Sequence, residues 1–165
     1  MNQESVSVYP EPRIVRTPAT PAAGRASGTA VTLSGDGAEG AAAILGQFGW
    51  RRDADGLLVV SGLRVDGAGS GSARRGPGDV LALECRTVGD ATLAEDPISG
   101  YRHGEGYRLA LSEKGDRGLL EYVEQAGLRY GLATLDSLVR TDELLPGLEI
   151  LDAPRFPIRG IIEGY

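Results

Sequence analysis

Side chains that could perform acid–base chemistry are few and scattered along this sequence of 165 residues. Close carboxylate pairs include Asp53 with Asp55, Glu121 with Glu124, and Asp142 with Glu143. Paired carboxylates are common on solvated surfaces, and nothing apolar around these pairs marks a pocket that would shift a pKa. We therefore interpret all three pairs as surface charge.

Nucleophilic and ligand-binding side chains are equally sparse. Cys85 lies in the apolar run VLALEC, where a packed thiol is expected rather than a nucleophile. His103 could bind a metal with Glu105, but zinc sites use three or four protein ligands, and this segment has no second His or Cys. The Gly-rich segment 66–79 lacks the Lys-Ser/Thr end of a phosphate-binding loop. The sequence therefore predicts no metal site, no cofactor and no catalytic set.

Net charge and length exclude several classes of protein. The formal net charge is −6, which gives no electrostatic reason to expect a nucleic acid or an anionic membrane as partner. The length suits one domain with its own core, whereas a (β/α)8 barrel needs about 250 residues. The first residues show no signal peptide. The protein is then secreted if such a peptide was removed, and cytoplasmic otherwise.

Hydrophobic periodicity predicts two helices among several strands. The helices are expected in the segments 36–49 and 127–140. The strands are expected in the segments 29–35, 56–65, 80–85, 106–112 and 118–126, with Ile14 and Val15 at a sheet edge. This order of elements is typical of an α+β domain, in which a mainly antiparallel sheet carries two helices on one face.

Local signals refine the two helices. Asp36 and Glu39 have the spacing of a capping box at the start of the first helix, and Gly49 can end it in the left-handed conformation. The second helix has a wide apolar side. Its members are Leu128, Leu132, Leu135, Leu138 and Val139.

The segments EGYRLALS, GLRYGLATLDSLVR and LPGLEILDAPRFPIRGIIEGY, together with YPEPR near the start, carry a family resemblance. They resemble the noncatalytic domain that precedes the barrel in bacterial β-N-acetylhexosaminidases and β-N-acetylglucosaminidases, glycoside hydrolase families 20 and 84. The ending RGIIEGY is similar to family 84, because family 20 usually continues after Arg-Gly with an Asp and an Arg-His pair. The resemblance spans residues 9–165.

This resemblance implies a domain organisation and an activity. Residues 1–8 would be a disordered or tag-like start, 9–152 the accessory α+β domain, and 153–165 a linker with the beginning of the first barrel strand. The family uses two adjacent aspartates on a later barrel strand to assist attack by the substrate's own 2-acetamido group. We therefore expect a fragment that is inert alone and belongs to an enzyme removing terminal β-linked N-acetylglucosamine from a glycan or glycoprotein.

The resemblance also implies roles for residues at the end of the sequence. Gly164 would let the backbone approach the sugar, and Tyr165 would form part of the pocket wall. Arg159 matches the arginine that grips two sugar hydroxyls in family 20. An interdomain or surface ion pair is the other interpretation of Arg159.

In the resembling families the two helices lie between the sheet and the barrel. This arrangement implies that the second helix presents an apolar surface to the catalytic barrel, and that Leu138→Glu would cost little stability in this chain. Weak self-association through that surface is also expected. The predicted interface residues are Leu128, Leu132, Leu135, Leu138 and Phe156.

Two other functions stay open at this point. A free-standing carbohydrate-binding module would need exposed aromatic platforms, and aromatic residues make up only 5 % of the chain. A small autonomous hydrolase would need a nucleophile, a base and an orienting group, which the sequence does not supply.

Overall fold

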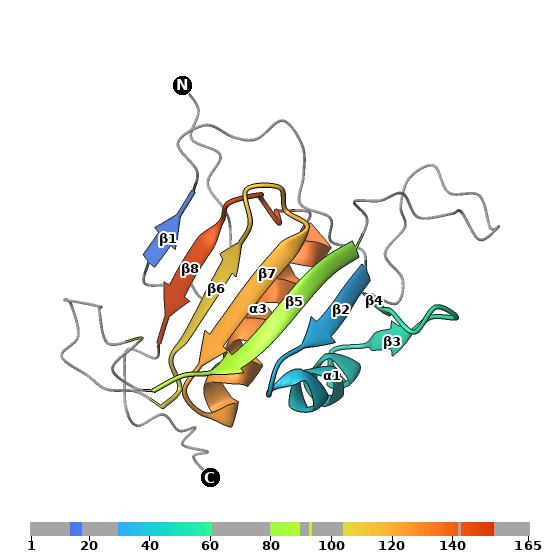
Figure 1. Ribbon diagram of the computed structural model, residues 1–165, viewed down its shortest axis with the longest axis horizontal. Coiled ribbons are helices and arrows are strands. Elements are labelled where there is room, and N and C mark those ends of the chain that lie inside the picture. The colour runs from blue at the N-terminus through green and yellow to red at the C-terminus, as the bar shows by residue number, and fades with distance from the viewer. Residues whose placement is uncertain are drawn as a thin grey trace, which may run out of the picture.

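One sheet organises the parts of the chain that the computed structural model describes, which are residues 14–17, 30–60, 80–89, 93, 104–141 and 143–153. Its strands run in the order β1-β8-β6-β7-β5-β2-β4-β3. They are β1 (Ile14–Arg16), β2 (Ala30–Ser34), β3 (Trp50–Arg52), β4 (Leu58–Val60), β5 (Val80–Thr87), β6 (Tyr107–Leu111), β7 (Arg117–Tyr122) and β8 (Glu149–Asp152). Of the two helices, α1 (Ala38–Gln47) and α3 (Gln125–Thr141), α3 lies behind the sheet in Figure 1 and α1 lies below the end of β2.

Most neighbouring strands of the sheet are antiparallel. The pairs β1–β8, β2–β4, β3–β4, β6–β7 and β6–β8 are antiparallel. The pairs β2–β5 and β5–β7 are parallel. The prediction of an α+β fold with a mainly antiparallel sheet and two helices on one face is therefore confirmed.

Alternation in β6 shows how the sequence selects the two faces of the sheet. Tyr107, Leu109 and Leu111 are buried on the side of the helices, whereas Arg108 and Ala110 lie on the opposite side, which we call the open face. The Tyr107 hydroxyl forms a buried hydrogen bond of 2.6 Å with Thr134 Oγ1 on α3. This bond identifies the helix side of the strand.

The start of α1 differs from the prediction of a capping box, which is wrong. The N-cap residue is Gly37, and no side chain caps the helix. The Asp36 carboxylate instead accepts a hydrogen bond of 3.0 Å from the Thr87 backbone N–H, at the end of β5. Because that bond holds the Asp36 side chain toward the sheet, the carboxylate does not cap the N-terminus of α1. Gly49 does adopt a left-handed φ of 90° just after α1, as predicted.

The helix α3 approaches the sheet closely through its glycines. A Cβ atom on Gly127 would collide with the backbone carbonyl of Gly106, directly before β6. A Cβ atom on Gly131 would collide with Leu120 of β7. Glycine at these two positions therefore lets the helix backbone lie against β6 and β7.

Two strands were absent from the sequence-based prediction. The strand β3 is only three residues long, and it follows α1 after a tight turn at Gly49. The strand β8 lies between β1 and β6 in the segment before Ala153. The expected strand 118–126 is shorter in the structure, because α3 already begins at Gln125. Neither described helix has the combination of length and apolar character required to cross a membrane.

Candidate functional site

The residues predicted to contact sugar cannot be placed. Gly164, Tyr165 and Arg159 lie outside the described residues, and so does Phe156 of the predicted interface. His103 and Asp142 also lie outside them.

The structure contradicts the predicted exposed apolar surface on α3. Leu128, Leu132, Leu135 and Leu138 are each 0 % exposed and belong to the hydrophobic core. The prediction that this side of the helix is an open interface is therefore wrong.

The apolar side of α3 is buried because it contacts two neighbours instead of one. The helix packs on β6 and β7, and it also packs on α1. A Cβ atom on Gly40 of α1 would lie 3.5 Å from Leu128 Cδ2, so the small residues of α1 leave room for the leucines of α3. The wide apolar side of α3 is thus buried within this domain, and no further partner is needed to cover it.

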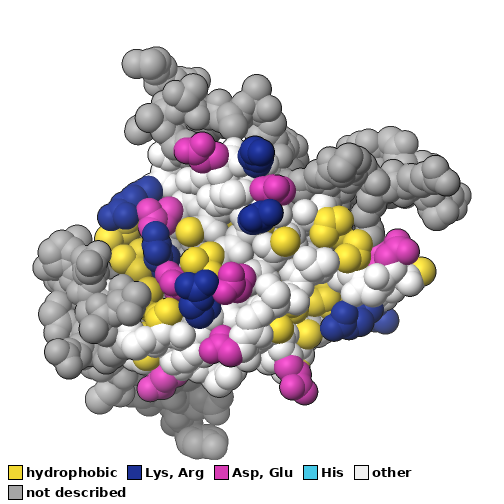
Figure 2. All heavy atoms as spheres, in the orientation of Figure 1, with side chains coloured by type: hydrophobic (Ala, Val, Ile, Leu, Met, Phe, Trp, Pro, Cys, Tyr) yellow, Lys and Arg dark blue, Asp and Glu magenta, His cyan; other side chains and the backbone are white. Residues whose placement is uncertain are grey.

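The open face of the sheet carries the most organised set of charged side chains in the described residues. We call this set the charged row (Figure 2). Its members, in order across the sheet, are Arg16, Glu149, Arg108, Glu121, Arg86 and Glu84. The signs alternate along the row, and its members come from β1, β8, β6, β7 and β5. Ion pairs therefore connect strands that are distant in sequence.

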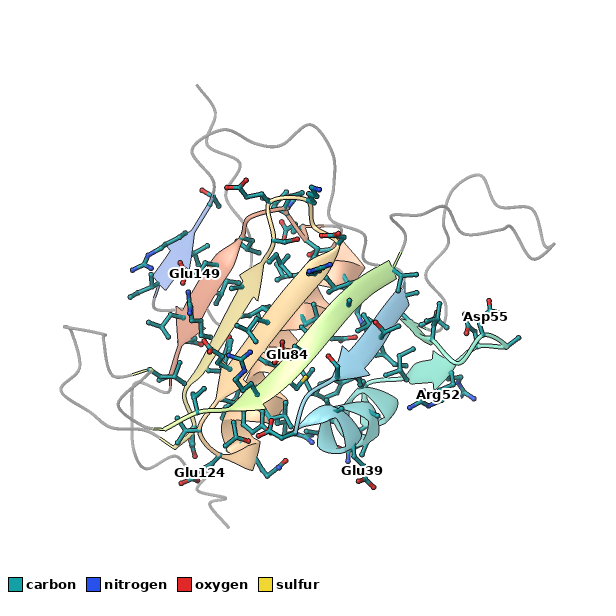
Figure 3. The ribbon with its side chains drawn as sticks, viewed as in Figure 1. Glu39, Arg52, Asp55, Glu84, Glu124 and Glu149 are labelled. Carbon is teal, nitrogen blue, oxygen red and sulfur yellow. The ribbon has the colours of Figure 1, made fainter. Side chains whose placement is uncertain are left out.

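Short distances link the first half of the row. Arg16 Nη1 donates to Glu149 Oε2 at 3.0 Å. Arg108 Nε donates to Glu149 Oε1 at 2.7 Å, and Arg108 Nη1 donates to Glu121 Oε2 at 3.2 Å. Figure 3 labels Glu149 on β8, toward one edge of the sheet. The Glu149 carboxylate is thereby shared between two guanidinium groups, and Arg108 is shared between two carboxylates.

The second half of the row is formed on β5. Arg86 Nη1 lies 3.9 Å from Glu121 Oε1, and Arg86 Nη2 donates to Glu84 Oε1 at 2.7 Å. Only 9 % of the Glu121 side chain is exposed, although it lies on a face that no described helix covers. The long arginine side chains cover it and place their charged ends in water.

The electrostatics of the row favour the charged form of the Glu149 carboxylate. Partial burial alone would raise the pKa of the Glu149 carboxyl, but hydrogen bonds from Arg16 and Arg108 outweigh it and lower that pKa. A general acid needs the opposite shift, toward neutral pH. The charged row therefore has the properties of a structural network.

Two further candidates from the sequence, Cys85 and Asp53, have structural roles. Burial raises the pKa of the Cys85 thiol to about 12, so Cys85 is a packed core residue, as predicted. Asp53 Oδ1 accepts hydrogen bonds from the backbone N–H groups of Asp55 and Leu57, so this carboxylate closes a turn. Within the described ranges, no three His, Cys, Asp or Glu side chains are grouped as metal ligands.

Aromatic side chains of the described residues face inward, with one exception. Trp50, Tyr107 and Tyr122 are 2–3 % exposed and pack in the core. Tyr130 on α3 is 39 % exposed. One exposed tyrosine does not make the flat multi-ring platform that sugar-binding modules use.

Sequence reasoning missed two features of this surface. The charged row has only a weak signal: Glu84 and Arg86 at alternate positions of β5, and one of its members in each of β6 and β7. The exposed side chains of Tyr130 and Val15 were not singled out, because one lies in a helical stripe and the other in a short β-prone run. Both features depend on which strands become neighbours.

Comparison with known proteins identifies the fold. No family model matches the chain, and the curated proteins give no significant match. The solved structure of CpGH84B matches with a TM-score of 0.55 and 17 % identity, over 98 % of this chain and 25 % of that one. The β-N-acetylhexosaminidase from Bacteroides fragilis NCTC 9343 matches with a TM-score of 0.48 and 19 % identity, over 90 % of this chain and 25 % of that one. This chain thus spans about a quarter of the length of each, and it shares its fold with part of CpGH84B.

Proposed function

We propose that this chain is the noncatalytic accessory domain of a retaining glycoside hydrolase that removes terminal β-linked N-acetylglucosamine. The hydrolase would use substrate-assisted catalysis, in which the 2-acetamido group of the sugar attacks the anomeric carbon. The domain itself would support the catalytic barrel and be inert alone.

The observation that carries this proposal is the coverage of the structural match. Nearly the whole of this chain corresponds to a quarter of CpGH84B, so the same fold occurs there as one part of a much longer chain. The designation GH84 in that name agrees with the family 84 resemblance of the closing segment RGIIEGY. At 17 % identity the match concerns fold, and the step from fold to function is our proposal.

The end of β8 supports the proposed domain boundary. The last strand among the described residues, β8, ends at Asp152. We assign residues 9–152 to the accessory domain and 153–165 to the linker and the beginning of the first barrel strand. In this assignment Gly164, Tyr165 and Arg159 contact sugar only in the longer enzyme, and Phe156 lies near the junction.

Two features favour this function over a free-standing carbohydrate-binding module. The core aromatic side chains are turned toward the helices, and the charged row occupies the open face with internally paired charges. A face whose donors and acceptors already satisfy one another offers few groups to sugar hydroxyls.

The gene beyond the codon for Tyr165 provides the direct test. The proposal predicts that the reading frame continues into a barrel-sized segment with two adjacent aspartates near a later strand. A stop codon directly after Tyr165, or a continuation without a barrel pattern, would contradict the proposal.

A further inference from the structure

One row of side chains on the helix side of the sheet is covered along most of its length. Strand register aligns it across five strands, as Cys85, Leu120, Leu109, Ile150 and Val15. The first four are 0 % exposed, whereas Val15 is 37 % exposed. The same apolar row therefore continues beyond the covered part of the sheet.

The positions of the helices explain this change. The helix α3 packs on β6 and β7, and α1 packs on β2, β3 and β5. In Figure 1 α3 lies behind the strands, while β8 and β1 lie to one side of it. Among the described elements, α3 thus covers β6 and β7 and lies next to the helix side of β8 and β1, which it does not cover. We call this surface the β8–β1 step.

Tyr130 lies on the flank of α3 that faces the step. It is three residues after Gly127 and four before Thr134, so the three share one side of the helix. Gly127 contacts the chain at Gly106, just before β6, and Thr134 bonds to Tyr107 of β6. The strand order continues from β6 to β8 and β1. Tyr130 and Val15 are the exposed large hydrophobic side chains of the described residues, and both border this step.

The opposite flank of α3 is already occupied. Trp50 Nε1 donates to Asp136 Oδ1 at 2.6 Å, and Arg140 Nε donates to the same carboxylate. Arg129 lies over the Phe48 ring, 5.5 Å from its centre. These contacts connect α3 to the end of α1 and to β3, so this flank is closed by the domain's own residues.

We propose that the catalytic domain docks on the β8–β1 step, with apolar side chains packed against Tyr130 and Val15. This inference rests on the proposed function. The chain leaves β8 at Asp152 and Ala153, so the segment that follows begins at the edge of the step. The charged row on the open face is a poorer docking surface, because burial of its ion pairs would require desolvation of each charge.

Cysteine labelling tests the location of the interface. Val15→Cys and Tyr130→Cys place a thiol in the step, and Ala82→Cys places a control thiol on the exposed part of the open face. The natural Cys85 is buried with a raised pKa and contributes little background reaction. Each variant is made in this 165-residue chain and in the full chain with all residues that follow Tyr165 in its gene. The rate of reaction with a maleimide is measured for both.

The proposal predicts that labelling at positions 15 and 130 slows by about tenfold or more in the full chain, while labelling at position 82 is unchanged. Equal rates at 15 and 130 in both chains, in a full chain that hydrolyses an aryl N-acetylglucosaminide, would overturn the docking site and leave the proposed function standing. Shielding of both positions in a full chain without that activity would support the docking site and contradict the proposed function.

Discussion

The two faces of the sheet are covered in different ways. On the helix side, α3 packs on β6 and β7 while α1 packs on β2, β3 and β5, and the leucines of this layer are almost fully buried. On the open face, the charged row lies across β1, β8, β6, β7 and β5, and arginine side chains cover the carboxylate of Glu121. One face is stabilised by packing and the other by ion pairs whose ends remain in water.

This difference predicts where the stability of the domain resides. Burial of a leucine side chain contributes about 1.5–3 kcal/mol, whereas an exposed ion pair contributes about 0–1 kcal/mol. Substitutions on the helix side should therefore have much larger effects than substitutions in the charged row. The following predictions test this contrast, from the largest expected effect to the smallest.

Leu138→Glu should unfold the chain. Leu138 is 0 % exposed, and a carboxylate at that position would be buried without a partner, at a cost of several kcal/mol. The total stability of a domain is typically about 5–15 kcal/mol. Circular dichroism should show loss of the cooperative thermal transition. This result would replace the sequence-based expectation that Leu138→Glu is tolerated.

The matched control for this prediction is Ala82→Glu on the open face. Ala82 is exposed and pairs in register with Arg117 of β7. We expect a change within about 0.5 kcal/mol, as is usual for surface substitutions. Equal destabilisation by the two variants would contradict the contrast between the faces.

Gly127→Ala should destabilise the domain by about 1–3 kcal/mol, because the new methyl group would overlap the backbone carbonyl of Gly106. The control is Gly46→Ala in α1, where a Cβ atom meets nothing within 4 Å. That variant should gain up to about 1 kcal/mol from helix propensity. Urea unfolding should give changes of opposite sign. A neutral Gly127→Ala would mean that α3 does not lie closely against β6.

Glu121→Gln should cost about 1 kcal/mol, because it removes the charge shared by Arg108 and Arg86, whose side chains are 41 % and 49 % exposed. The control Glu113→Gln changes an exposed carboxylate in a turn and should be close to neutral. The difference should shrink in high salt, because solvent ions screen exposed charges. A loss as large as that from a core leucine would contradict the assignment of the row to a solvated face.

The smallest expected effect is a pH dependence at Glu149. The bonds from Arg16 and Arg108 lower the pKa of this carboxyl despite the opposing effect of partial burial. The stabilisation by the charged form is therefore complete above the unfolded pKa of about 4.3 and is lost as the pH falls through the lower folded pKa. Wild type should exceed Glu149→Gln in stability at pH 7, and the gap should close in acid. A stability difference between wild type and Glu149→Gln that grows as the pH falls would contradict the lowered pKa of Glu149.

The helix side of the sheet was largely predictable from the sequence. The strand β6 and the apolar stripe of α3 could be located from the sequence, because packing periodicity is a local property, but the stripe was wrongly expected to stay partly exposed. The error concerned what covers the apolar stripe of α3. A local sequence pattern does not reveal that the stripe packs on α1 as well as on the sheet. The small residues of α1, such as Gly40, were the relevant signal.

The open face was not predictable in the same way. Arg16 and Glu149 are 133 positions apart in sequence, and their pairing depends on β1 joining β8. Nothing in the local sequence of either strand specifies that neighbour. The step bordered by Tyr130 and Val15 was missed for the same reason, since it exists only once the strand order is known.

Hydrolysis of an aryl N-acetylglucosaminide by the purified 165-residue chain tests the central claim most directly. A domain that only supports a catalytic barrel should release no chromophore above buffer, while the full chain containing it should turn the substrate over. Turnover by the 165-residue chain that survives repurification would contradict the assignment to a noncatalytic accessory domain.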